Sequence, residues 1–163
     1  MDDRAHRRFA LAVVASLEDT LTITRHLVQA DLEPRLISVI GQEASFAGER
    51  RHAVELALIL GRSGMTPRLA ADSNRIVALS RDCEDLPEAA ARHAGPFGKL
   101  PLQWLPSDHA ERIADVLNRG EFLLLVELHS MVDERVAARI LLRDCRRPVE
   151  VHDVRPAADE LRP

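Results

Sequence analysis

Two Glu-x-His pairs are the residues whose types and spacing could do chemistry. Glu127 and His129 end the stretch FLLLVELHS, and Glu150 and His152 lie in the stretch PVEVHDV. Because side chains alternate across a strand, the two members of each pair would point to the same face. Imidazole and carboxylate groups together suit divalent ions and small polar ligands. These four residues form the candidate ligand-binding site, and the sequence leaves the identity of any metal open.

Each pair also has a plainer interpretation, in which it is the solvated end of a strand. In a sheet whose first strand lies between the two pair-bearing strands, the pairs would be roughly 9–10 Å apart. The sequence does not fix them at the same height in the sheet. Convergent side chains would favour a ligand site, and side chains splayed into solvent would favour the plainer interpretation.

No other residues form an enzyme signature. Cys145 lies among arginines, which would lower the pKa of its thiol, but near a predicted helix C-terminus, which would raise it. We expect a packed or idle thiol there. The serines lack a G-x-S-x-G context, and no phosphate-binding loop or dinucleotide fingerprint occurs. We therefore expect no catalytic residues and no cofactor, and favour a non-enzymatic protein over an enzyme.

The only tryptophan, Trp104, is the candidate interface residue, together with Leu102 and Leu105. It lies in the proline-bounded segment PLQWLP. One interpretation is a side chain that fills the core of a protein poor in aromatic residues. The other is an exposed anchor for a protein partner, since tryptophan is enriched among the residues that dominate binding energy.

Composition bounds the class of protein. The chain has 163 residues, of which 46% are apolar and 29% charged, as in a globular domain. A formal charge of −4 with 3% aromatic residues argues against nucleic-acid binding. The charged N-terminus does not resemble a signal peptide, and no apolar run suits a membrane span. We expect a soluble, cytoplasmic protein without membrane insertion. The single lysine, Lys99, among many arginines suggests a GC-rich bacterial genome.

Hydrophobic patterning predicts two strand–helix–strand halves, at 9–41 and 122–154. In the first half, Ser16 is the expected N-cap of the helix. Two such halves predict an α+β, ferredoxin-like sheet of four strands with both helices on one face. Such a sheet leaves an edge or a face uncovered, so we expect a homodimer.

Residues 43–121 form a predicted helical insertion between these halves. One helix is expected near GERRHAVELALILGRSG, with Val54, Leu58 and Gly61 on one apolar line and Ala57 and Leu60 beside them. NRIVALS suits a short strand, and SDHAERIADVLNRGE suits a helix that ends before Gly120. The whole of 1–163 is expected to be a single domain, with a frayed tail at 155–163.

The C-terminal part has an Arg119–Gly120 turn after an acidic helix, a strand at 122–128, and a final Val149–Glu150–Val151–His152. In these features it resembles a known family, the bacterial general stress protein (heat-induced stress protein) domain. The opening strand–helix–strand is similar as well. The resemblance implies a stress-associated role and gives no catalytic residues. Family members often carry a glycine-rich apolar hairpin in the middle, and this chain has charged helical segments instead.

Two functions follow as expectations. The first is a stress-associated or regulatory protein–protein interaction module without enzyme activity. The second is a small-ligand or divalent-metal-binding module that uses the two Glu-x-His pairs.

Overall fold

A computed structural model describes residues 7–61, 69–73, 75–80 and 107–154. The candidate interface residues Leu102, Trp104 and Leu105, and the predicted tail at 155–163, lie outside these ranges.

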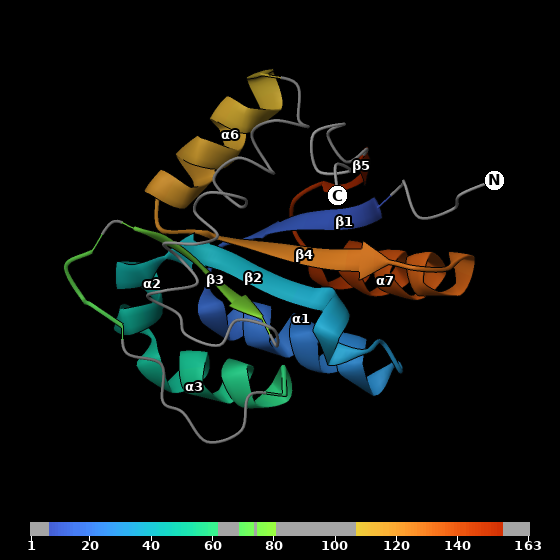
Figure 1. Ribbon diagram of the computed structural model, residues 1–163, viewed down its shortest axis with the longest axis horizontal. Helices are drawn as coiled ribbons and strands as arrows, with labels where there is room; N and C mark the ends of the chain where they lie inside the picture. The colour runs from blue at the N-terminus through green and yellow to red at the C-terminus, as the bar shows by residue number, and fades with distance from the viewer. Residues whose placement is uncertain (1–6, 62–68, 74, 81–106, 155–163) are drawn as a thin grey trace, which may run out of the picture.

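The described chain is an α+β protein built on a five-stranded antiparallel sheet (Figure 1). The strands are β1 (Arg7–Val14), β2 (Ile37–Gln42), β3 (Ile76–Ser80), β4 (Phe122–Leu128) and β5 (Val149–Val154). Their order across the sheet is β3-β2-β4-β1-β5. The four strands of the two predicted halves are confirmed. The count of four is wrong, because the short strand predicted in NRIVALS joins the same sheet as β3 beside β2.

In the described ranges, five α-helices and one 3-10 turn accompany the sheet. They are α1 (Leu17–Gln29), the 3-10 turn Pro34–Leu36, α2 (Glu43–Gly48), α3 (Arg50–Ile59), α6 (Ser107–Asn118) and α7 (Met131–Asp144). The insertion at 43–121 is therefore not wholly helical, since it contributes β3 as well as helices.

Local signals set the helix boundaries. Ser16 Oγ accepts a hydrogen bond from the Asp19 N–H at 3.1 Å and caps α1 as predicted, and Ser130 caps α7 in the same way. Gly120 follows α6 with a φ of 80°, and its N–H donates to the Leu117 carbonyl at 3.0 Å. This left-handed residue is the glycine stop predicted from the sequence.

The helices cover the two faces of the sheet unequally. Helices α1, α3 and α7 pack with α2 on one face, around Leu27, Leu56 and Leu141. Both helices of the predicted halves thus lie on one face, as expected. Helix α6 packs on the opposite face through Ile113, Val116 and Leu117.

The apolar stripe predicted for α3 is wrong in part. Ala57 and Leu60 are buried, but Leu58 is exposed, and the helix buries Ala53 and Leu56 as well. Helix α3 packs against α1, so this neighbour decides which of its two apolar sides is buried. In α7 the buried residues are Ala137, Ile140 and Leu141, and Val132 is exposed.

Within the residues described, no helix is both long and apolar enough to cross a membrane.

Candidate functional site

The strands that carry the two Glu-x-His pairs lie on either side of β1, as predicted. Phe9 on β1 pairs with Glu127 on β4 and with His152 on β5. Directly paired residues of neighbouring strands share a face. Leu11 and Leu125, in the next row, pack against α6. The pairs therefore project from the face that α6 partly covers.

The two pairs are offset by one row along the strands. Leu11 pairs with Glu150, so Glu150 lies one row closer to the middle of the sheet than Glu127 and His152 do. His129 follows the last residue of β4. Glu127 and His152 are thus level with each other, with β1 between them, at two strand spacings or roughly 9–10 Å.

Each histidine pairs with the glutamate of its own strand. His129 Nε2 lies 3.3 Å from Glu127 Oε1, and His152 Nε2 lies 3.0 Å from Glu150 Oε2. Arg112 of α6 forms an ion pair with Glu150. The His129 side chain is 48% exposed and that of His152 18%, so the β5 pair is the more enclosed.

The positions of these side chains can be compared with the expectation that the two pairs hold a divalent metal ion. Among the residues that the structure describes, no group of three or more His, Cys, Asp or Glu side chains is arranged to hold a metal ion. What the arrangement offers instead is two Glu–His pairs on one face, with Phe9 between the strands that carry them. Such a surface could bind a small polar molecule.

Cys145 is a poor nucleophile. It caps the C-terminus of α7, where its N–H donates to the Leu141 carbonyl at 2.8 Å. Burial, and then the nearby Asp144 carboxylate, raise the pKa of the thiol to about 11. The protonated thiol therefore dominates at neutral pH, consistent with the expected packed cysteine.

Sequence patterning missed a group of exposed apolar residues beside β5. Met131 and Leu142 lie about three helical turns apart and so share one side of α7, where both are exposed. Glu134, one turn from Met131, forms an ion pair with Arg8 on β1, the strand next to β5. Met131 and Leu142 are thus exposed on a helix that contacts β5. On β5 itself, Val151 is 41% exposed.

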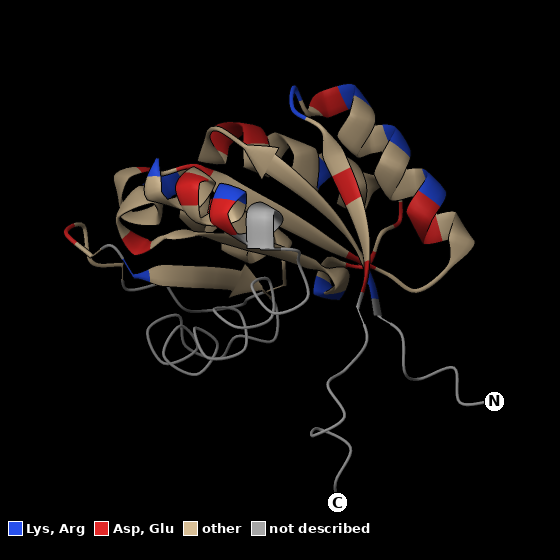
Figure 2. Cartoon of the chain, turned by 90° about the horizontal axis from the view of Figure 1, so that it is seen from above, with Lys and Arg blue, Asp and Glu red and all other residues tan. Residues whose placement is uncertain are grey.

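Strand β5 is also an edge strand. It pairs with β1 on one side, and no strand lies on its other side in the part of the chain that is described. Figure 2 shows acidic and basic residues interspersed along the longer helices, such as α7.

Comparison with protein-family models, with curated proteins and with solved structures found no match.

Proposed function

We propose that this chain is a non-enzymatic interaction module that works as a homodimer through the edge of β5. The observation that carries the proposal is the outer edge of β5, beside which the described residues place no strand, with Val151 exposed on β5 and Met131 and Leu142 exposed on α7. An open edge offers backbone hydrogen bonds to a further strand, and exposed apolar side chains beside it supply burial.

The sequence of β5 favours a second copy of the same strand as the occupant. In an antiparallel pair centred on Val151, each Val151 faces its counterpart. Glu150 of one copy then faces His152 of the other, and the same contact occurs a second time across the twofold axis. Two glutamates directly opposite each other repel, whereas glutamate opposite histidine does not, so this register is preferred over one that pairs Glu150 with itself.

The helix side of the same edge would extend the interface. Met131 and Leu142 are exposed on α7, the helix that contacts β5, so the second copy would cover them. A stable homodimer usually buries more surface than one strand pair provides. Contacts from α7 supply part of the additional area.

The fold assignment is part of the proposal. Without the edge strand β3, the order β5-β1-β4-β2 is that of two interlocked split β-α-β units, which supports a ferredoxin-like domain. The stress-associated or regulatory role is supported by the resemblance to general stress proteins at Arg119–Gly120 and Val149–His152.

Sedimentation equilibrium over a concentration series tests the proposal. The wild type should be a dimer. Val151→Lys should be a monomer with an unchanged circular-dichroism spectrum, because the substitution brings two ammonium groups together on the twofold axis. Val132→Lys is the matched control, since Val132 is 68% exposed on α7 but is not part of β5. A monomeric wild type, or equal loss of dimer in both variants, would contradict the proposal.

A second function, binding of a small polar ligand at the Glu-x-His pairs, is favoured by one observation. Glu127 and His152 lie level on the same face of the sheet. Native mass spectrometry of the purified protein should then show mass above that of the bare chain. The added mass should disappear in His152→Ala while the fold is retained. Bare mass in the wild type would leave the pairs as solvated strand ends.

A further inference from the structure

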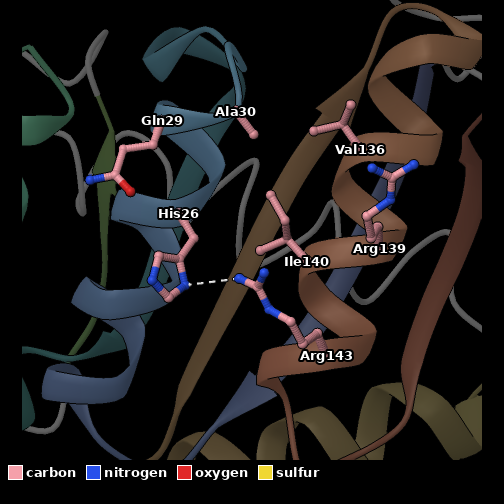
Figure 3. A pocket seen from close by; sticks show the side chains of 7 residues that line it. All are labelled: His26, Gln29, Ala30, Val136, Arg139, Ile140 and Arg143. Atoms are coloured by element: carbon pink, nitrogen blue, oxygen red, sulfur yellow. Dashed lines mark hydrogen bonds between the residues drawn. The ribbon is translucent and has the colours of Figure 1, made fainter.

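A cleft separates α1 from α7 on the helix-covered side of the sheet. It has a volume of about 510 Å³, which lies within the usual range for small-molecule sites. Its lining includes His26 and Ala30 from α1, and Val136, Arg139, Ile140 and Arg143 from α7 (Figure 3). Neither the Glu-x-His pairs nor Val151 belongs to this lining.

The cleft carries a net positive charge. The carboxylate of Asp144 lies 2.6 Å from His26 Nδ1, and a different oxygen of it lies 2.6 Å from Arg143 Nε. Arg139 forms no ion pair with any residue in the described ranges. Asp144 thus pairs with Arg143 and His26 but not with Arg139, so the positive charge of Arg139 stays uncompensated among the described residues.

The walls of the cleft are apolar. In Figure 3 the side chains of Val136 and Ile140 point from α7 toward α1, where Ala30 lies. At one end the Arg143 guanidinium approaches His26, with Arg143 Nη2 3.2 Å from His26 Nδ1. An apolar gap with arginines beside it suits a molecule that is apolar at one end and anionic at the other.

We infer that the cleft binds a small organic anion, a carboxylate or phosphate carried on a compact apolar group. Guanidinium groups bind both kinds of anion through paired hydrogen bonds. Arg139 is the residue expected to determine affinity, because Arg143 is already engaged by Asp144. The inference goes beyond the proposed dimer and does not depend on it.

Amide chemical-shift titration of the full chain tests the inference, with benzoate and phenyl phosphate as probes. Both should shift amides of residues 26–30 and 136–143. Arg139→Gln should weaken binding about tenfold or more, since it removes the uncompensated charge. Arg135→Gln is the matched control, because Arg135 is exposed on the same helix but does not line the cleft. It should leave affinity within about twofold.

The other outcomes of this titration identify the kind of anion or overturn the inference. Tighter binding of one probe tells whether the natural anion is a carboxylate or a phosphate. Benzyl alcohol, which lacks the charge, and inorganic phosphate, which lacks the ring, should both bind more weakly than the probes. Absence of shifts at the cleft, equal binding of benzyl alcohol, or equal effects of the two arginine variants would overturn the inference. Circular dichroism of Arg139→Gln should match the wild type, because this side chain is exposed.

Discussion

Asp144 is the carboxylate that ties the end of α7 to α1. Hydrogen bonds from Arg143 lower the pKa of Asp144 to about 2; burial opposes them, and His26 adds a further lowering contribution. The folded-state pKa is thus below the unfolded one. The resulting stabilisation is present in full above about pH 4 and is lost as the pH falls toward 2.

Asp144→Asn should lower the free energy of unfolding at pH 7 by about 1–2 kcal/mol, less than the pKa shift alone gives, because water screens the exposed Arg143. Urea unfolding at pH 7 and at steps between pH 4 and 2 measures this, and the difference from wild type should shrink over the acidic range. Asp115→Asn, at an exposed position on α6, should stay within about 0.5 kcal/mol. A difference that persists at pH 2 would contradict the linkage.

Glu43 holds the segment before β3 against the start of α2. Its carboxylate is buried, accepts the Ala70 N–H at 2.9 Å and lies 3.0 Å from Arg75 Nη2. Burial alone would raise the pKa of Glu43, but hydrogen bonds from Ala70, Ser73 and Arg75 and the charge of Arg75 outweigh it, and the pKa is lowered.

Glu43→Gln should cost about 2–3 kcal/mol of unfolding free energy, because it leaves the buried contacts of Ala70 and Arg75 poorly satisfied. Chemical unfolding at pH 7 measures the loss. Glu111→Gln, on the exposed surface of α6, is the comparison and should be close to neutral. Equal values for the two variants would show that the Glu43 contacts contribute little.

Sequence reasoning at the residue scale succeeds where the relevant geometry is local. The shared face within each Glu-x-His pair follows from strand alternation, and the Ser16 cap follows from helix chemistry. The role of Glu43 does not follow, because its partners Ala70 and Arg75 are 27 and 32 residues away in the chain. The offset of one row between the two Glu-x-His pairs does not follow from the sequence either. It depends on which residues of β1 pair with those of β4 and β5.

At the scale of elements, β2 meets the start of β4 through a close contact at Gly41. A Cβ at Gly41 would lie 2.7 Å from a Phe122 ring carbon and 3.2 Å from Phe46. These two rings pack edge to face with centroids 5.1 Å apart. Only glycine fits there without moving the aromatic pair.

Gly41→Ala should therefore destabilise the protein by about 1–3 kcal/mol, as overpacking of a core does. Gly48→Ala is the matched control. No atom lies within 4 Å of a Cβ at Gly48, and alanine is the better helix former, so this variant should be neutral or slightly stabilising. Thermal unfolding of both variants measures the contrast, and a neutral Gly41→Ala would mean that Phe122 can move aside without cost.

Which elements form was largely predictable, and how they pack was not. Strand and helix signals in the two halves are local, and so is the glycine stop at Gly120. The exposure of Leu58 was not predicted, because the apolar residues of α3 offer two stripes and the neighbouring helix α1 selects one. The short helix α2 carries no periodic pattern over its six residues, Glu43–Gly48.

At the scale of the whole molecule, the sheet of the described residues ends in two edge strands, β3 and β5. Patterning predicted that β4 and β5 flank β1, since two strand–helix–strand halves interlock in that way. It did not predict which edge carries exposed apolar side chains, because exposure at Val151 and Leu142 depends on how far α7 reaches over β5. The dimer proposed for this edge would make three kinds of contact. These are backbone hydrogen bonds between the two β5 strands, burial of the exposed apolar residues, and contacts between Glu150 of one copy and His152 of the other.

Disulfide trapping at Val151 tests that dimer most directly. In an antiparallel strand pair, facing Cα atoms lie about 4.5–5.5 Å apart, within the range that a disulfide spans. Val151→Cys is made in a background where Cys83 and Cys145 are replaced by serine and alanine, with Val132→Cys as the control. Under mild oxidation, non-reducing electrophoresis should show Val151→Cys as a covalent dimer and Val132→Cys as a monomer. A monomeric Val151→Cys, or equal cross-linking of the two variants, would contradict association through β5.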